Sequence, residues 1–319
     1  MSDRICYVNG AFVPESEAKI SVFDRGFTSG EGVYEVTRSF GHEPFRLREH
    51  LDRLYRSLRY TRLDCGITQP EMDKLSREVF AKNVRALEKH QDHALWHVIS
   101  RGIQTPHVPG HGKTTVVMFC VPVDAAGFAR DYVDGVPLVV PSTRRIPVQS
   151  LDPKAKVTNK VNHLLAAHEA RQVDPKAVPL MLDTDGNISE THLSNFCFIT
   201  GKTIYTPSER GVLGGITKMT IVELADMLGL DLLQGNYSPY DVYNADEAFI
   251  CSTSFSILPA RSLDGIAIGH GVPGPWTVRL IEAWSELVRV DIVDQAIQHL
   301  PAEDARRYRD RWHEARRRN

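Results

Sequence analysis

Three lysines, Lys154, Lys156 and Lys160, lie within seven consecutive positions, directly before a helical pattern of apolar residues. Pro153 keeps the residue before it extended and Thr158 is a good N-cap, so we expect Lys156 where a strand leads into a helix and Lys160 in the first helical turn. A lysine that is buried near the positive end of a helix loses its proton more easily, as an amine that attacks a carbonyl must. Taken alone, the cluster is more typical of a solvent-exposed basic patch.

A glycine turn in the stretch GVLGGITKM could bind an anion. Gly214 and Gly215 permit unusual backbone torsions, and they precede a helix that begins at Ile216, with Thr217 adding a hydroxyl. The free N–H groups and the positive dipole end of such a helix suit a phosphate. The signal is weak by itself, because most glycine turns before helices bind nothing.

Hydroxyl, arginine and carboxylate side chains elsewhere could complete such a site. Three hydroxyls follow an apolar strand pattern, although turn-forming residues explain them equally well: Ser252, Thr253 and Ser254. Arg53 shares a helix face with Glu49, so it forms either an ordinary i,i+4 pair or the fixed cation of a phosphate site. Glu190 lies among short predicted strands, where a carboxylate is more often at a sheet edge than in a site.

Composition and motifs exclude several classes of function. The 38 lysines and arginines nearly balance the 40 acidic residues, so a small-molecule ligand is expected rather than nucleic acid or an anionic membrane. The chain has no nucleotide-binding P-loop, no dinucleotide glycine motif following a strand, no serine nucleophile elbow and no zinc-type pattern of histidines or cysteines. No metal site is expected.

The cysteines and the lengths of the apolar runs indicate where in the cell the protein is expected. The 5 cysteines are odd in number, widely spread and mostly flanked by apolar residues, as reduced core thiols of a cytosolic protein are. No apolar run has the length of a signal peptide or of a membrane-spanning helix. We therefore expect a cytoplasmic protein.

The predicted elements mix strands with helices without regular alternation, which favours an α+β fold with largely antiparallel sheets. Hairpin strands are predicted at 5–8 and 11–13, and further strands at 32–40, 94–100 and 115–123. We place a smaller N-terminal domain at 1–123, a linker at 124–136 and a larger domain at 137–319, which ends in a charged, solvated helix or tail. The helix after the lysines has its apolar positions at Val161, Leu164, Leu165 and His168.

Seven stretches, in this order between Ile5 and Trp284, make the chain resemble the class IV pyridoxal-phosphate aminotransferases. The family includes branched-chain and D-amino acid aminotransferases, aminodeoxychorismate lyases and (R)-selective amine transaminases. The stretches are VFDRGFTSGEGVYEVTRSF, PFRLREHLDRLYRSL, DPKAKVTN, DGNISETHLSNFCFI, GVLGGITKMTIVELA, ADEAFICSTS and DGIAIGHGVPGPWTVRL. The resemblance implies a two-domain fold type IV enzyme that binds pyridoxal 5'-phosphate, with a homodimer whose subunits share the active sites.

The resemblance also assigns cofactor-binding residues. Lys156 matches the Schiff-base lysine, and Lys160 stands where branched-chain enzymes commonly have tyrosine. Glu190 matches the carboxylate that keeps the pyridine nitrogen protonated, although Thr191 replaces the glycine that usually follows it. The residues that match the phosphate site or pack on the ring are Arg53, Leu213, Gly215, Ile216, Thr217, Ser252 and Thr253.

The residues expected to contact the substrate do not match the pattern of any one subfamily. Ala94 and Trp96 replace the tyrosine and arginine that branched-chain enzymes carry on one strand, and Trp96 indicates an apolar pocket or only fills the core. Tyr34 agrees with D-amino acid and amine transaminases. The Arg-x-His carboxylate trap of D-amino acid enzymes is absent around His107. Other candidate substrate contacts are Arg38, Arg101, His107 and Ser254.

Together these features predict a transaminase that moves an amino group from a D-amino acid or chiral primary amine to a 2-oxo acid, with pyruvate or 2-oxoglutarate as acceptor. The expected mechanism is a ping-pong reaction through a Schiff base on Lys156, which also moves the proton. The alternatives are a branched-chain L-amino acid aminotransferase, an aminodeoxychorismate-type lyase, and a catalytically silent binding protein.

Overall fold

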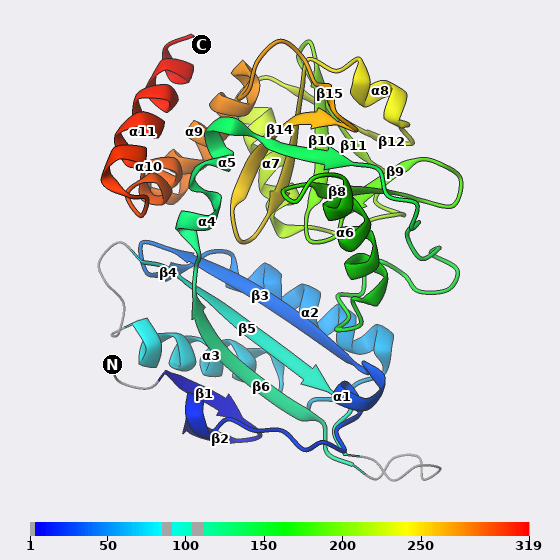
Figure 1. Cartoon of the computed structure of the whole chain (residues 1–319). Coiled ribbons are helices and arrows are strands. Elements are labelled where there is room, and N and C mark those ends of the chain that lie inside the picture. Colours follow the sequence, from blue (N-terminus) through cyan, green and yellow to red (C-terminus); the bar gives the residue numbers. More distant parts are fainter. Residues whose placement is uncertain (1–3, 85–90, 104–111, 319) are drawn as a thin grey trace. The chain divides into compact units, whose positions relative to one another are not determined.

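The computed structural model describes residues 4–84, 91–103 and 112–318. The chain divides into two compact units (Figure 1). The first unit is Met1–Val123 together with Lys154–Lys160, and the second is Asp124–Pro153 together with Val161–Asn319. The predicted domain at 137–319 therefore lacks the lysine stretch, which belongs with the N-terminal residues.

The first unit is built on a six-stranded antiparallel sheet in the order β2-β1-β6-β5-β3-β4. Its strands are β1 (Ile5–Val8), β2 (Ala11–Pro14), β3 (Gly32–Phe40), β4 (Glu43–Pro44), β5 (His93–Ser100) and β6 (Thr115–Pro122). Its helices are the 3-10 turn η1 (Glu15–Glu17), α1 (Arg25–Ser29), α2 (Leu47–Thr61) and α3 (Gln69–Val84). The long helices α2 and α3 lie on one face of the sheet (Figure 1).

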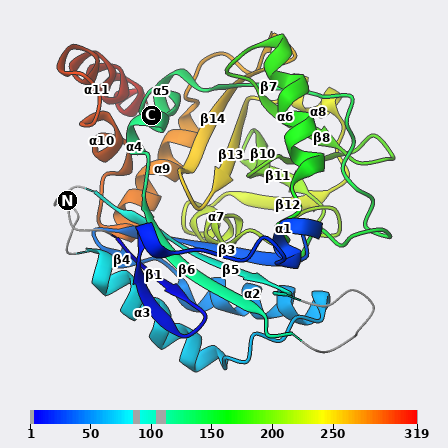
Figure 2. The same ribbon diagram turned by 60° about the horizontal axis from the view of Figure 1, so that its bottom comes forward.

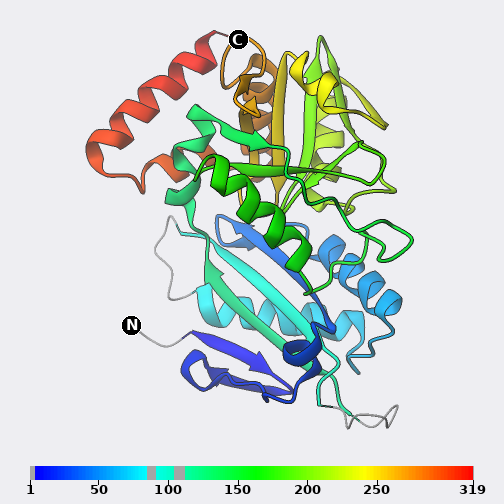
Figure 3. The same ribbon diagram turned by 45° about the vertical axis from the view of Figure 1, so that its right-hand side comes forward.

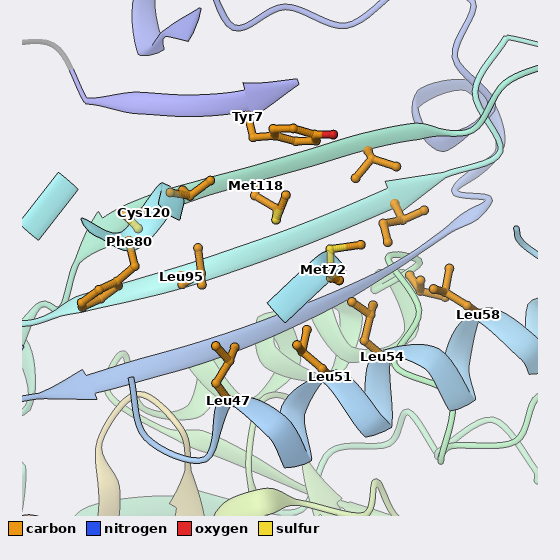
Figure 4. Packing of buried hydrophobic residues seen from close by; sticks show 14 of the residues in the cluster. Tyr7, Leu47, Leu51, Leu54, Leu58, Met72, Phe80, Leu95, Met118 and Cys120 are labelled. Carbon is orange, nitrogen blue, oxygen red and sulfur yellow. The ribbon is translucent and has the colours of Figure 1, made fainter. Parts of the chain in front are cut away.

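The core of the first unit lies between that face and the two helices (Figure 4). Leu47, Leu51, Leu54 and Leu58 recur at helical spacing in α2, and all four are buried. They meet every second residue of the strands, because successive strand side chains point to opposite faces. The strand residues in this cluster are Tyr7, Val33, Leu95, Ile99, Val116, Met118 and Cys120.

The stretch Lys154–Lys160 forms an additional short pairing along the outer edge of β3. An antiparallel bridge joins Val157 to Val33, and the N–H of Tyr34 donates a hydrogen bond to the carbonyl oxygen of Lys156 (3.0 Å). These main-chain contacts fix the lysine stretch to the sheet of the first unit. Lys156 therefore lies on an extended segment and not at the beginning of a helix.

The expected helix cap at Thr158 is wrong. Its hydroxyl donates to the carbonyl oxygen of Gly30 (3.1 Å) and its N–H to that of Gly32 (2.9 Å), so Thr158 continues the pairing with β3. The helix begins only at Val161, and Lys160 precedes it instead of lying in its first turn. The polar groups of Thr158 are used for strand pairing and are therefore not available to cap the helix.

The second unit contains a nine-stranded mixed sheet, in which β15 pairs only with β14 and the other strands follow the order β12-β11-β10-β13-β14-β7-β8-β9. The pairs β7–β8, β7–β14 and β11–β12 are parallel. The strands are β7 (Val136–Val139), β8 (Val178–Leu182), β9 (Ile188–Thr191), β10 (Asn195–Thr200), β11 (Thr203–Pro207), β12 (Asp231–Gly235), β13 (Glu247–Ser252), β14 (Ser256–Leu263) and β15 (Ile266–Ala267).

Helices α7 and α9 pack against β13 and β14 of this sheet (Figure 2). The helices are α4 (Ala125–Ala129), α5 (Asp131–Asp134), α6 (Val161–Val173), α7 (Ile216–Met227), α8 (Pro239–Tyr243), α9 (Pro275–Val288), α10 (Ile292–Ile297) and α11 (Ala302–Arg317). Residues 124–136, interpreted as a linker, form α4, α5 and the start of β7, and bury Ala129 and Tyr132. Within the described residues no helix has both the length and the apolar composition needed to cross a membrane.

Helix α6 connects the parallel strands β7 and β8, and it packs through small residues. Its buried face carries His163 and the alanines at 166, 167 and 170. The apolar positions singled out in the sequence lie on the other side: Val161, Leu164 and Leu165 are 61%, 52% and 52% exposed. Small side chains let the helix approach the sheet closely. The larger apolar side chains therefore form a strip on the exposed face of α6.

The C-terminal helix α11 is packed onto the second unit, beside α9 and α10 (Figure 3). Tyr308 and Trp312 are buried, and ion pairs fasten the charged face, as between Arg309 and Asp294 (2.6 Å). The interpretation of this segment as a merely solvated tail is therefore wrong. Few apolar residues recur at helical spacing in this segment, and the many arginines between them obscure the amphipathic pattern in the sequence.

A buried ion pair ties α2 to β3 inside the first unit. The carboxylate of Glu35, which is fully buried, accepts from Nε (2.8 Å) and Nη2 (2.6 Å) of Arg53 and contacts Nδ1 of His50 (3.0 Å). Burial raises the pKa of Glu35, but attraction and hydrogen bonds from Arg53 and His50 outweigh it and hold that pKa well below its ordinary value. Burial lowers the pKa of His50.

We predict that Glu35→Gln lowers the free energy of unfolding of the first unit by about 3–5 kcal/mol, because it leaves Arg53 as a buried charge without its counterion. A depressed carboxyl pKa stabilises the fold above the unfolded value and loses that contribution as the pH falls through the folded value. The deficit, measured by urea unfolding, should therefore shrink below about pH 4.5. Glu49→Gln, on the partly exposed side of α2, is the control and should change stability little. Equal losses in both variants would contradict this account.

Candidate active site

Lys156 is held at a fixed place beside Tyr34. Its N–H donates to Oγ of Ser57 in α2 (3.0 Å), while its carbonyl oxygen accepts from Tyr34. Its Nζ lies 4.4 Å from the centroid of the Tyr34 ring, and the residue is half-buried. Lys154, in contrast, is exposed. The main chain on both sides of Lys156 is thus anchored, and its amine is directed over an aromatic ring.

Three aromatic rings stand in a row on the face of the first sheet opposite α2 and α3. Tyr34 and Trp96 have ring centroids 5.7 Å apart and planes at 15°, and Trp96 and Phe119 are 5.9 Å apart with planes at 8°. The strand register explains the row. Trp96 on β5 is directly opposite Phe119 on β6 and Val36 on β3. Val36 lies two positions from Tyr34 and on the same face of β3, so the three rings share one face of the sheet. Lys156 lies at one end of this aromatic row.

Arg38 and Ser254, two of the remaining substrate candidates, belong to different units. Arg38 lies on the same face of β3 as Tyr34, is 3% exposed, and has its guanidinium carbon 4.4 Å from the centroid of Phe40. His107 lies outside the described residues. Ser254 belongs to the exposed turn between β13 and β14 in the second unit.

Arg53 is not the mobile surface cation that a helix position suggests. It is 4% exposed, and Glu35 engages it through two nitrogens of its guanidinium. A paired arginine contributes a rigid fork of donors more than a net charge. If it binds a phosphate, it does so as an oriented donor.

Glu190 is the centre of a buried polar network in the second unit. Its carboxylate accepts from Nη2 of Arg145 (2.9 Å), from the N–H of Leu213 (3.1 Å) and from Nδ2 of Asn195 (3.2 Å). Arg145 in turn contacts Nε2 of His163 through Nη1 (2.7 Å). Glu190 lies on β9, the last strand in the sheet order, but it is only 5% exposed, so its carboxylate is a fixed acceptor paired with Arg145.

The loop before α7 is placed by the same network. Nδ2 of Asn195 also donates to the carbonyl oxygen of Leu213 (3.0 Å). Gly215, the N-cap of α7, has an ordinary φ of −71°, so the expected unusual torsion is not the reason for a glycine there. A Cβ at Gly215 would instead collide with Oδ1 of Asn195. Close approach, not backbone freedom, requires this glycine.

The first turn of α7 is suited to an anion. Its N-cap makes no side-chain hydrogen bond to the helix, and Ile216 and Thr217 are buried there. Lys218 is 4% exposed, and its Nζ has no hydrogen-bond partner within the part of the chain that the structure describes. A buried cation and free N–H groups at one helix end both favour a bound negative charge. Thr253 lies in the turn after β13, next to Ser252 at the strand end.

Several residues of these networks escape sequence reasoning. Arg145 and His163 have no motif spacing, because their contacts join segments that are far apart in the chain. Asn195 lies in the stretch DGNISETHLSNFCFI, five positions after Glu190, but sequence reasoning assigns no role to it. Glu35 offers one signal: it is a carboxylate within the apolar strand pattern of GVYEV. A charge at such a position must find a buried partner, and that partner is Arg53.

Comparison with known proteins places the chain in a family. The family model described as amino-transferase class IV matches residues 32–263. A relative named as a putative branched-chain-amino-acid aminotransferase of Methanocaldococcus jannaschii is 31% identical over 285 residues, which cover 88% of this chain and 95% of that protein. A D-alanine aminotransferase of Bacillus licheniformis is 30% identical over 272 residues, covering 84% and 92%.

Solved structures show the same fold. The branched-chain amino acid aminotransferase of Escherichia coli matches with a TM-score of 0.84 and 30% identity, covering 90% of this chain and 95% of that one. The branched-chain amino acid aminotransferase of Thermobaculum terrenum, in its PLP form, matches with a TM-score of 0.79 and 27% identity, covering 90% and 94%. The chain therefore belongs to the class IV aminotransferase family and has its α+β, fold type IV architecture.

Proposed function

We propose that this aminotransferase uses pyridoxal 5'-phosphate attached to Lys156 to move an amino group from a D-amino acid or a chiral primary amine to a 2-oxo acid. The anchored position of Lys156 over Tyr34 carries the proposal, because a nucleophilic amine needs a fixed approach to the carbonyl that it attacks. Similar solved structures are described in a PLP form or with pyridoxamine 5'-phosphate, which supports the cofactor.

The buried networks suit the parts of this cofactor. Glu190 would accept from the ring nitrogen, since Arg145 and Asn195 hold its carboxylate in place. The residues that we assign to the phosphate or to packing on the ring are Arg53, Leu213, Gly215, Ile216, Thr217, Ser252 and Thr253. When bound, the cofactor supplies an electron sink for the bond broken at the substrate carbon.

Lys156 has a second task in the proposal, which is to move a proton. Its amine lies over Tyr34, and its backbone is held from both sides, so the side chain alone changes position. A base held close to the reacting carbon contributes about 10²–10⁴-fold to the rate. In the proposed ping-pong order the first product leaves before the second substrate binds, and Lys156 would move the proton in both half-reactions.

The aromatic row supports a donor with an apolar or aryl substituent. Tyr34, Trp96 and Phe119 provide flat surfaces beside Lys156, and aromatic pairs contribute about 0.5–1.5 kcal/mol beyond area burial. For donors or acceptors with a carboxylate, the candidate contacts are Arg38, His107 and Ser254. Pyruvate and 2-oxoglutarate are the proposed acceptors.

A branched-chain L-amino acid substrate is the second candidate. It is favoured by the names of the M. jannaschii relative and of the E. coli structure, whereas the B. licheniformis relative is named for D-alanine. An apolar row accommodates a branched aliphatic side chain as well as an aryl group. The two candidates differ in donor chirality, which an enantiomer panel distinguishes.

We also propose a homodimer. The strip of Val161, Leu164 and Leu165 on α6 is more than half exposed in the single chain. Contiguous apolar surface of this kind is typical of a subunit interface. The same strip gives a direct test of assembly.

Our first functional prediction is that Lys156→Ala abolishes amino transfer while Lys154→Ala retains it, because Lys156 is anchored over Tyr34 and Lys154 is exposed. Transfer is measured with purified protein, pyridoxal phosphate, paired enantiomers of amino acids and amines, and pyruvate or 2-oxoglutarate. The loss should exceed about 10³-fold. Full activity of Lys156→Ala, or product release that needs no acceptor, would overturn the proposal; the second result would indicate a lyase.

Trp96→Ala tests the aromatic row. We expect kcat/KM for a donor with an aryl substituent to fall about 5–10-fold, equivalent to about 1–1.5 kcal/mol, with a much smaller change for a donor bearing only a methyl group. Val98→Ala, on the same strand and face, is the matched control. An equal loss for both donors would show that Trp96 only fills the core.

Leu165→Asp tests the dimer. Burying a carboxylate in an apolar interface is unfavourable, so this variant should sediment as a monomer where the unmodified protein sediments as a dimer. His168→Asp, on the exposed part of the same helix, is the control. A monomeric unmodified protein at micromolar concentration would reject the proposed assembly.

A further inference from the structure

Lys156 shares the ring of Tyr34 with a second lysine. The Nζ of Lys160 lies 5.6 Å from the same ring centroid that the Nζ of Lys156 approaches at 4.4 Å. The two nitrogens are therefore no farther apart than 10.0 Å, the sum of these distances. The pattern DPKAKVTNK thus brings two amines, and not one, to a single aromatic surface.

The main chain holds this arrangement. Thr158, halfway between the two lysines, is bound to Gly30 and Gly32 through its hydroxyl and its N–H. Lys160 is half-buried and directly precedes α6. The positive end of a helix dipole and a neighbouring ammonium both oppose a positive charge at this place.

Other charged groups near Lys156 in the first unit largely cancel one another. Glu35 and Arg53 form a buried pair, and burial lowers the pKa of His50 beside them. Tyr34 attracts both ammonium groups through its ring face but carries no charge of its own. Lys160 places a second ammonium at the ring that Lys156 approaches, so its removal takes away a positive charge close to the Lys156 amine.

We propose that Lys160 is an electrostatic positioning residue, which favours the neutral form of the Lys156 amine and of its bond to the cofactor. At about 10 Å, the largest separation that the two distances allow, an ammonium lowers the pKa of an amine by about 0.3 in water and by about 1.2 at an effective dielectric constant of about 20. A shorter separation gives a larger effect at either dielectric constant. The inference rests on the proposed attachment of the cofactor to Lys156, but one arm of its test needs no cofactor.

The first experiment titrates the visible absorbance of the cofactor-loaded full chain against pH. Lys160→Met should move the midpoint of the absorbance transition upward by about one pH unit, because the repelling charge is removed. Lys160→Arg keeps the charge and should leave the midpoint near that of the unmodified protein. Lys154→Met removes an exposed lysine from the same stretch and is the matched control. A purely structural role of Lys160 would not produce this ordering.

The second experiment measures the reactivity of Lys156 with acetic anhydride in the full chain prepared without cofactor. Peptide mass spectrometry follows labelling as a function of pH, and Lys160→Met should shift the labelling midpoint of Lys156 upward. Lys160→Gln serves if the methionine variant fails to fold. An unchanged midpoint in both charge-removing variants, or an equal shift in Lys154→Met, would overturn the inference. If no Lys156-dependent absorbance exists, the proposed function fails, while labelling still decides the role of Lys160.

Discussion

The pairing of residues 156–158 with the outer edge of β3 is the constraint on which the proposed active site depends. Each main-chain hydrogen bond contributes only about 0.5–1.5 kcal/mol, but together they fix where Lys156 leaves the sheet. They bring a segment that follows residues 124–153 of the second unit into the first unit. The position of Tyr34 beneath both lysine amines follows from this register.

Each unit also keeps one buried carboxylate paired with an arginine. Glu35 orients Arg53 in the first unit, and Glu190 is held by Arg145 in the second. Such pairs are weak evidence for stability, because desolvation offsets much of the attraction. Their value here lies in preorganisation: donors and acceptors with fixed directions cost little further ordering when a ligand binds.

The sequence was sufficient for what depends on local pattern, and insufficient where distant segments compete. Strand patterns identified β1, β2, β3, β5 and β6 of the first unit. Strand pairing overrode the expected cap at Thr158, and alanine packing turned the apolar positions of α6 outward. Arg145 could not be found, since only the folded chain brings it to Glu190, 45 positions away. Resemblance to the family selected Lys156; the geometry explains why that position is anchored.

The most direct test of the central claim is to identify the lysine that carries the cofactor. Reduction of the cofactor-loaded protein with borohydride fixes the cofactor to its lysine, and peptide mass spectrometry then locates the modified residue. The pairing with β3 predicts one modification per chain, at Lys156, with Lys154 and Lys160 unmodified. Attachment at either of the other two lysines, or no attachment at all, would contradict the account.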